Sequence, residues 1–387
     1  MPPTLQSLVT QTLKTTWQLT AANRNPGYEK NVHRIQGFVA GALFITVINI
    51  VGELLFEYHP QDARALATAW ATAVLAAFVY AWIVASIDRN EKEPWQMLLV
   101  GLLWGSMVSA AIAGLLNSIA DSFLNVKAHV VSPFTEEFSK GAILVLIFKY
   151  AEDEFDDALD GLIYGAMVGI GFAMAENATY FFRHEPARDI SGQIQTFQFL
   201  LRGVLQGLAG HATYTALIGL GLGLSRQTRQ RELKMLLPIL GLLLAVLAHA
   251  LWNNESVQSF LDRLFNQQNI WGAGPTAARV ALINGPFFFS VIIAVTLTWR
   301  KEALVIAEQL TDELKPNDPY VSPAMMLTVS GRLLARWRIL WMRGIGAWWT
   351  LKQLQRAYIE LAFCKWRDKE DREIRQRIQT LRDRLES

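Results

Sequence analysis

The sequence predicts an all-α protein, a polytopic membrane bundle of about eight transmembrane helices with a helical cytoplasmic C-terminal tail. The first indication is composition: 52% of the residues are hydrophobic and 18% are charged, below the roughly 25% charged residues of soluble domains. The second is that most charges lie outside a few long apolar runs. Runs of about 20 apolar residues are the length that a helix needs to cross a hydrocarbon core of ~30 Å.

Eight stretches meet this length and apolarity. They are approximately residues 37–57, 65–87, 95–119, 128–149, 159–182, 198–224, 235–252 and 280–299. The third and fifth are the clearest, and Gly285 and Pro286 interrupt the eighth. With eight spans, the loops on the same side of the membrane as the N-terminus contain more Lys and Arg than the loops on the other side. By the positive-inside rule, we expect a multi-pass protein of the plasma (inner) membrane with both termini in the cytoplasm.

The charge distribution divides the chain into a polar leader (1–36), a membrane domain (37–299) and a tail (300–387). Residues 316–323 form a linker rich in helix-breaking residues. In the stretch 332–356 that follows, arginines and lysines are interleaved with tryptophans, and no acidic residue occurs. Such a helix is suited to lie on an anionic leaflet, although an amphipathic helix packed on its own domain has the same pattern. No folded nucleic-acid motif accompanies the basic residues, so we expect no nucleic-acid partner.

The fourth predicted span contains the sequence SPFTEEFSKG, with Glu136, Glu137 and Lys140 among apolar residues. Charged groups inside a membrane are costly and therefore indicate a functional site. Lys140 lies four and three residues after the two acids, so it shares a helical face with both. We expect the ammonium to keep at least one carboxylate charged and available as a base. The alternative is an ion pair that serves only helix packing.

The fifth and sixth predicted spans carry a glycine stripe and two further polar residues. Gly161, Gly165 and Gly169 recur every four residues and predict close approach of another helix. Glu176 follows near the end of the fifth span, where it could instead face the headgroups. His211 lies in the glycine-rich sixth span and could be a satisfied packing residue.

The seventh predicted span ends with His249 and Asn253, which are four residues apart and share a helical face. At 1.5 Å per residue, Glu136, Glu176, His211 and His249 all lie roughly 5–20 Å from the same membrane face. Helix packing alone does not explain this common depth. We therefore expect the polar groups of four spans to form one site.

One chemistry for this site is zinc hydrolysis, because three protein ligands and an open position characterise a catalytic zinc. The ligands would be Glu176, His211 and His249, with Glu136 or Glu137 as the base that deprotonates the bound water. The chain has a single cysteine, which excludes zinc sites built on several cysteines. The HExxH motif of soluble metalloproteases is absent.

The other chemistry needs no metal. A glutamate–histidine pair would activate water directly, and His249 and Asn253 would donate hydrogen bonds to the oxyanion. The residue types alone leave both versions open.

The motifs SPFTEEFSKG, DGLIYGAMVGIGFAMAEN, GHATYTALIGLGLG and HALWN, in this order over about residues 95–255, closely resemble the PrsW family of intramembrane proteases. This family is related to the CAAX-prenyl protease and bacteriocin-immunity superfamily. The resemblance implies a multi-pass bundle with a proteolytic centre, and site-1 cleavage of a membrane-spanning anti-sigma factor as the activity of the best-known member. The positions of this chain that match the functional positions of the family are Glu136, Glu137, Glu176, His211, His249 and Asn253.

The sequence thus predicts an intramembrane endopeptidase that acts on a membrane-anchored protein substrate within the lipid bilayer. A proton- or metal-coupled transporter would use the same residue types, but such transporters often repeat their polar helices in two halves, and no such repeat is present. A catalytically inactive scaffold would be expected to lack one of the catalytic residue types, and none is missing.

Overall fold

The computed structural model describes residues 33–44, 47, 63–183, 199–265, 274–368 and 370–386. Within this part of the chain every regular element is a helix, and no strand occurs. The chain divides into two compact units, one containing most of residues 25–295 and the other residues 89–92 and 296–387. We call the first the membrane unit and the second the tail unit. Much of the first predicted span, 37–57, lies outside the described residues.

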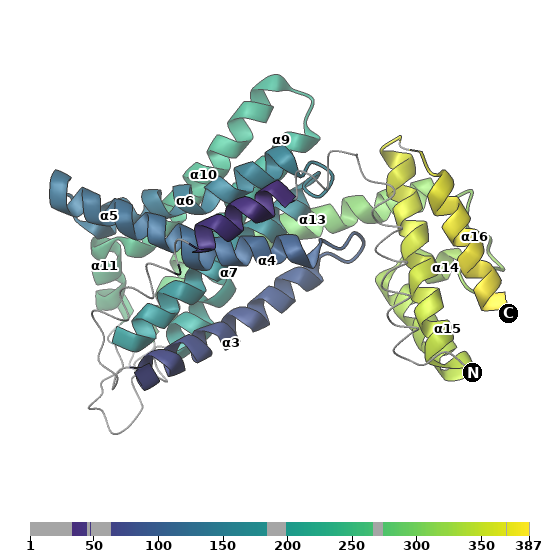
Figure 1. The fold of residues 1–387 in the computed structure, drawn as a ribbon, viewed down its shortest axis with the longest axis horizontal. Coiled ribbons are helices and arrows are strands. Elements are labelled where there is room, and N and C mark those ends of the chain that lie inside the picture. Colours follow the sequence, from purple (N-terminus) through teal and green to yellow (C-terminus); the bar gives the residue numbers. More distant parts are fainter. Residues whose placement is uncertain are drawn as a thin grey trace. The chain divides into compact units, whose positions relative to one another are not determined.

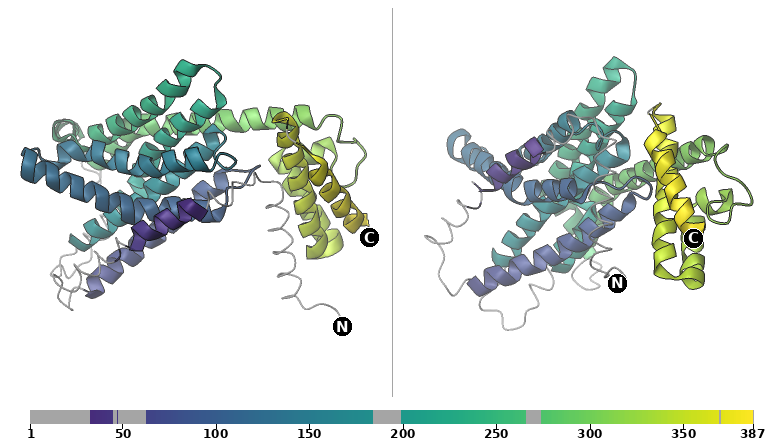
Figure 2. Two further views of the ribbon diagram at one scale, coloured as in Figure 1. Left: turned by 45° about the horizontal axis from the view of Figure 1, so that its top comes forward. Right: turned by 45° about the vertical axis from the view of Figure 1, so that its right-hand side comes forward.

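The membrane unit is a bundle of helices, most of them long (Figures 1 and 2). Its α-helices are α3 Ala63–Ile87, α4 Trp95–Leu103, α5 Ala110–Leu124, α6 Ala128–Tyr150, α7 Ala158–Arg183, α9 His211–Gln227, α10 Arg231–Asn253, α11 Glu255–Phe265, α12 Gly274–Arg279 and the first part of α13 Gly285–Gln309. The π-helices η1 Trp104–Ser109, η2 Phe199–Gln206 and η4 Val280–Asn284 and the 3-10 turn η3 Gly207–Ala209 interrupt them. The innermost helix is α7, which packs against α3, α4 and α9.

Five helical stretches in the described residues are long and apolar enough to cross a membrane. They are Leu66–Ile87, Trp95–Leu124, Ala158–Phe182, Arg231–Asn253 and Ala277–Gln309. This finding supports a multi-pass membrane protein but does not confirm the predicted count of eight. Helix α6 covers the fourth predicted span, but its four charged residues make it too polar for a membrane span judged by hydropathy. The sidedness of the termini stays a prediction.

The expectation of one continuous helix over 198–224 was wrong. The chain forms the π-helix η2, then the 3-10 turn η3, and only from His211 a regular α-helix. Gly207, with φ of +25°, and Gly210, with ψ of −127°, adopt backbone angles outside the α-helical region. These two glycines therefore end one helical segment and allow the next to begin within the bundle.

The glycine stripe of α7 faces α9, as its four-residue spacing predicted. A Cβ atom on Gly161 would lie 2.1 Å from the carbonyl oxygen of Gly219, and one on Gly165 would lie 2.4 Å from that of Thr215. One on Gly169 would lie 2.2 Å from the carbonyl oxygen of His211. The two backbones are in direct contact, which only residues without side chains permit.

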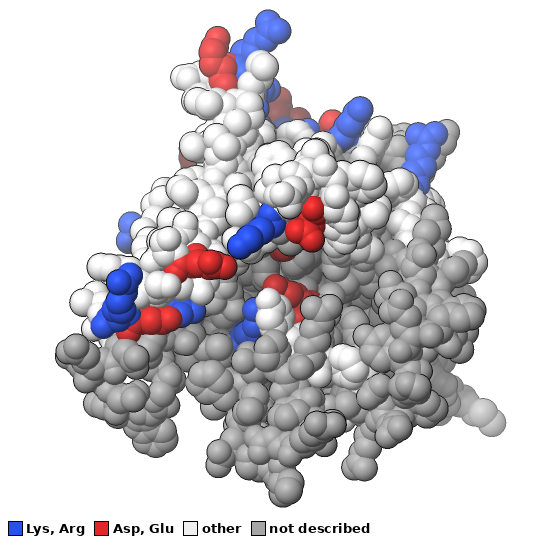
Figure 3. All heavy atoms as spheres, turned by 90° about the vertical axis from the view of Figure 1, so that its left-hand side faces the viewer, with Lys and Arg blue, Asp and Glu red and all other residues white. Residues whose placement is uncertain are grey.

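The outer surfaces of the membrane unit are apolar. Leu75, Phe78 and Trp82 on α3 are exposed, as are Leu243 and Leu247 on α10. On the face drawn in Figure 3, most of the described surface is uncharged, and the few charged side chains of the two signs lie close to one another. Exposed apolar helix faces of this kind are suited to contact with lipid.

The tail unit has its own apolar core. Its helices are the remainder of α13, the short α14 Pro323–Met326, the long α15 Val329–Trp366 and α16 Arg372–Glu386. Ile374, Ile378, Leu381 and Leu385 form the buried face of α16. The side chain of Thr328 accepts a hydrogen bond from the backbone N–H of Gly331 and so caps the start of α15. The placement of this unit in the cytoplasm stays a prediction.

Candidate active site

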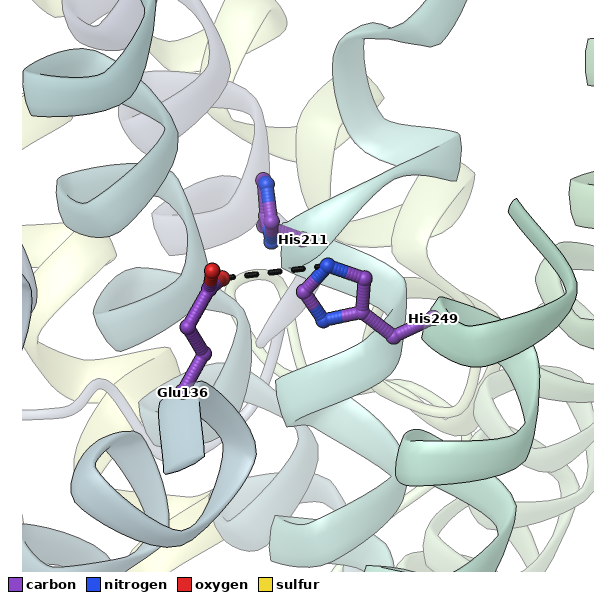
Figure 4. Close-up of side chains that lie close together, drawn as sticks. All are labelled: Glu136, His211 and His249. Atoms are coloured by element: carbon purple, nitrogen blue, oxygen red, sulfur yellow. Dashed lines mark ion pairs between the residues drawn. The ribbon is translucent and has the colours of Figure 1, made fainter. Parts of the chain in front are cut away.

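Four helices of the membrane unit bring ionisable side chains together, and we call this group the polar cluster. Its members are Glu136, Glu137 and Lys140 on α6, Glu176 on α7, His211 on α9 and His249 on α10. Figure 4 shows Glu136, His211 and His249 pointing toward one another, with the 3.7 Å contact between Glu136 Oε2 and His249 Nε2 marked by a dashed line. Glu137 and Lys140 are fully buried. The sequence expectation that these residues share one region is thus matched by their positions in the structure.

The position of His211 depends on the break before α9. His211 is the first residue of that helix, and Gly210 precedes it as the N-cap. The close approach at Gly169 brings the His211 backbone against α7, so that its ring reaches Glu176 two turns further along. A helix N-terminus carries a partial positive charge, which stabilises carboxylates placed next to it.

Lys140 lies at the centre of the polar cluster. Its Nζ donates to Glu137 Oε1 at 2.5 Å and to His211 Nδ1 at 3.1 Å. The same nitrogen lies 3.8 Å from Glu136 Oε2 and 4.1 Å from the centre of the Phe172 ring. The ammonium therefore pairs with Glu137 more closely than with Glu136, a choice that the helical spacing alone left open.

The hydrogen-bond partners of the two histidines determine their tautomers. An ammonium only donates, so His211 Nδ1 accepts, and its Nε2–H donates to Glu176 Oε2 at 2.7 Å. Glu137 Oε1 is an acceptor and lies 2.9 Å from His249 Nδ1, so Nδ1 carries the ring hydrogen of His249 and donates it to Glu137. In the neutral ring, His249 Nε2 then carries a lone pair and no hydrogen.

Two acceptors consequently face each other without a donor between them. Glu136 Oε2 is buried and accepts no hydrogen bond among the described residues. His249 Nε2 lies 3.7 Å from it. A buried acceptor left unmatched costs free energy, so this gap favours a water molecule, a proton or a cation.

The same atoms fit a metal ion. Glu136, His211 and His249 each offer one ligand atom within 4.8 Å of the others, and carboxylate oxygens and imidazole nitrogens are zinc ligands. This set contains Glu136 where the sequence suggested Glu176. Because both nitrogens of His211 have partners, His211 would bind a metal only by giving up its contact with Lys140 or with Glu176.

Two further residues contact the carboxylates of the polar cluster, and Arg202 among them was not identified from the sequence. Arg202 in η2 places Nη1 3.4 Å from Glu176 Oε2 and stacks its guanidinium on Tyr180 at 3.3 Å. Thr215 Oγ1 donates to Glu137 Oε2 at 3.3 Å. An arginine inside the sixth predicted apolar span was a signal that could have indicated Arg202.

A small pocket, with room for about one water molecule, opens beside the polar cluster. Glu176, His211 and Arg202 provide its polar wall. Small residues of α3 and η2, among them Ala73 and Gly203, line other parts of it.

The α10 residues are oriented by contacts on both sides. Tyr214 stacks on the His249 ring at 5.3 Å, and its hydroxyl donates to Asn284 Oδ1 at 2.8 Å. Asn253 lies one turn beyond His249, where its Nδ2 donates to Ser132 Oγ at 3.2 Å. Asn253 thus ties α10 to α6 next to the cluster. Its expected contact with an oxyanion stays a prediction.

The model of a known family covers every member of the polar cluster. The family is described as PrsW family intramembrane metalloproteases, and its match extends over residues 93–298. The chain belongs to the PrsW family.

Several curated relatives carry the name "Protease PrsW". The chain is 32% identical to the protein of Halalkalibacterium halodurans over 128 residues, which are 33% of this chain and 53% of that protein. It is 28% identical to the one of Geobacillus kaustophilus over 144 residues, 35% and 57% of the two chains. It is 34% identical to the one of Bacillus subtilis over 101 residues, 25% and 46% of the two chains. The chain therefore spans about half the length of these curated PrsW relatives. No solved structure matches it.

The PrsW match includes every member of the polar cluster and Arg202, but not the part of the pocket wall that α3 provides, and it ends within α13. Helices α14 to α16 lie outside it. The tail unit is thus an addition to the region that carries the family likeness.

Proposed function

We propose that the chain is an intramembrane endopeptidase that hydrolyses a peptide bond of a membrane-anchored protein. The observation that carries this proposal is the facing pair of buried acceptors, Glu136 Oε2 and His249 Nε2, beside a pocket inside an apolar bundle. A water molecule between these atoms has two acceptors for its protons. Its oxygen lone pairs then remain free to attack a carbonyl.

The reaction follows from this placement. Glu136 takes a proton as the water oxygen adds to the carbonyl carbon, and the same proton passes to the amide nitrogen when the C–N bond breaks. The products are a new carboxylic acid and an amine, so one water is consumed. Glu176 and His211 line the pocket next to which the scissile bond would lie.

The remaining members of the cluster hold the reacting groups. Glu137 accepts hydrogen bonds from Lys140, His249 and Thr215, and so fixes the tautomer that leaves His249 Nε2 free. A carboxylate that orients a histidine in this way strengthens the ring as an acceptor. Lys140 compensates the charge of Glu137 in the buried centre.

The family description names a metal, and the geometry allows one. Glu136, His211 and His249 would hold a zinc ion. When bound, the zinc would polarise the carbonyl or acidify its water. The positions of Glu137 and Lys140 serve the same orientation of His249 with or without it.

The substrate class follows from where the site lies. The site lies within a unit whose outer faces are apolar, and small residues line the pocket beside it, which favours a single-span membrane protein as the substrate. By the family resemblance, an anti-sigma factor cut at a first site is a candidate substrate. We further propose residence in the plasma membrane with both termini in the cytoplasm.

The test is cleavage of a panel of purified single-span membrane proteins, including anti-sigma factors, by the full-length chain in liposomes. Glu136→Gln and His249→Gln should each lower cleavage by about 10²- to 10⁴-fold, the range expected for losing a general base. The matched control is Glu232→Gln, an exposed acid in the first turn of α10, which should cut like the wild type. If both cluster variants retain full activity, the proposed site is wrong.

Metal content is tested separately. The purified chain is analysed for zinc and assayed again after chelation and after zinc is restored. A stoichiometric zinc that Glu136→Gln and His249→Gln both lose would support the metal version. Full cleavage by metal-free protein would refute it.

Arg202 is expected to position Glu176. Arg202→Gln should lower kcat by about 10- to 100-fold, the loss typical when a residue that orients a reacting side chain is replaced. Arg202→Lys keeps the charge and should recover part of the loss. Equal activity of Arg202→Gln and wild type would contradict this role.

A further inference from the structure

The long helix α15 of the tail unit folds back on itself. Gly344 has φ 80° and ψ −173°, which is outside the helical region. Arg336 Nε donates to Gln355 Oε1 at 2.6 Å, although 19 residues separate them. In a straight helix they would be about 28 Å apart at 1.5 Å per residue. Val329–Trp366 is therefore a helical hairpin whose tip lies at residues 341–346.

The tip and the outer side of this hairpin are apolar and exposed. Trp341 is 83% exposed, Ile345 77% and Met342 69%. The surface continues along the hairpin through Leu334 and Trp337. At helical spacing, this stripe lies opposite the residues that α15 buries in the tail core. A contiguous exposed apolar surface with several aromatic residues indicates an interaction site rather than a solvated face.

The charged residues within the hairpin segment itself are of one sign. Six basic residues and no acid occur between Val329 and Ile359. Arg343 donates to the hydroxyl of Tyr320 and to the carbonyl oxygen of Leu385, and Arg336 donates to the neutral Gln355. The acceptors of these bonds are uncharged, so the bonds do not neutralise the positive charge.

The cationic groups also act on one another. Burial and then the neighbouring Arg332 and Arg356 lower the pKa of Arg336 to about 10. Burial, followed by Arg356 and Arg336, also lowers the pKa of Lys352. An anionic partner would relieve this repulsion, whereas a neutral or basic one would not.

We propose that the α15 hairpin docks on an anionic lipid surface, with Trp341, Met342 and Ile345 inserted among the headgroups and the basic residues beside the phosphates. Tryptophan at the membrane–water interface and arginine next to anionic headgroups are the two contacts that such surfaces favour. The chain connects the hairpin to a bilayer, because α13, which belongs to the last candidate membrane span, ends at Gln309, shortly before the hairpin begins. This tether raises the local lipid concentration, so even weak interfacial binding would keep the hairpin docked.

The test places an environment-sensitive NBD label at the tip of the full-length chain. Cys364 is the one cysteine of the chain and is buried. In a Cys364→Ala background, Ile345→Cys carries the label, and Gln376→Cys on the exposed side of α16 is the matched control. Single molecules are placed in nanodiscs of phosphatidylcholine alone or mixed with phosphatidylglycerol. Lipids bearing a nitroxide near the headgroup serve as quenchers.

The label at position 345 should be quenched by the lipid nitroxide, and more strongly in discs with phosphatidylglycerol, while the label at 376 should not. Neutralising two flanking charges by Arg338→Gln and Lys352→Gln should lower the docked-to-undocked ratio about 30-fold, the factor that two such charges give at an anionic surface. Trp341→Ala, at an exposed position, is a second variant that should weaken quenching without unfolding the unit.

Two outcomes would overturn the proposal. One is a label at 345 that behaves like the label at 376 in both kinds of disc. The other is a blue-shifted label at 345 that the lipid nitroxide does not quench, because that label would lie against protein. Discs holding one molecule exclude a second copy of the chain as the covering surface.

Discussion

Replacing Lys140 with methionine tests whether the polar cluster is held together by charge compensation. The Lys140 side chain is fully buried, and its Nζ contacts Glu137 at 2.5 Å and His211 at 3.1 Å. Methionine has nearly the same volume, so the change removes the charge and leaves little cavity. Removing one partner of a buried ion pair costs about 3–5 kcal/mol, because the other charge stays buried. We expect a loss of this size in the free energy of unfolding, measured by denaturant titration in detergent micelles.

A double variant separates charge from packing. Glu137→Gln in the Lys140→Met background removes the orphaned charge, so it should recover a large part of the stability without restoring cleavage. The control is Lys149→Met at the exposed end of α6, which should change the free energy of unfolding by less than about 0.5 kcal/mol. If the double variant is no more stable than Lys140→Met, or if Lys140→Met is as stable as the wild type, charge compensation is not what holds the cluster.

Two other predictions concern the helix contact and the tail. Gly165→Ala places a Cβ 2.4 Å from the carbonyl oxygen of Thr215, so we expect a loss of about 1–3 kcal/mol in unfolding titrations. Gly114→Ala, with open space around its Cβ, should cost nothing, and equal losses in the two variants would refute the argument. The hydrogen bond from Arg375 lowers the pKa of Glu313 in the folded chain. The ionised carboxylate therefore stabilises the tail unit above the unfolded-state pKa of about 4.3, and this stabilisation is lost as the pH falls through the lower folded-state pKa. The protection of α16 amides against hydrogen exchange, relative to the intrinsic exchange rate at each pH, should therefore fall on acidification in the wild type more than in Glu313→Gln. Equal acid dependence of this protection in the two proteins would contradict the assignment.

Much of the architecture follows from local sequence patterns. Apolar runs about as long as a bilayer is thick predicted the helices, and the spacing of Gly161, Gly165 and Gly169 predicted the contact between α7 and α9. Both depend on the composition of single segments and on the regular geometry of a helix. The count of spans could not be predicted in this way, because the polar face of α6 and the glycine break before His211 give these segments a mixed character.

The residues of the candidate site were also visible in the sequence, since Glu136, Glu176, His211 and His249 are ionisable groups in apolar surroundings. Their motif order indicated the family that the match over residues 93–298 shows. The role of Arg202 was missed because this residue contacts Glu176 from a different helical segment. No spacing along one helix reports such a contact.

The sequence by itself determined which segments are helical, which of them carry charges, and to which family the chain belongs. Only the tertiary structure decided that Lys140 pairs with Glu137, that His249 presents a free nitrogen to Glu136, and that α15 turns back at Gly344. The reason is geometric. Helical periodicity relates residues within one element over a few ångströms, whereas the distance between two helices depends on how all their side chains pack together. A site built from four helices therefore acquires its hydrogen bonds, and with them its chemistry, only when the bundle has formed.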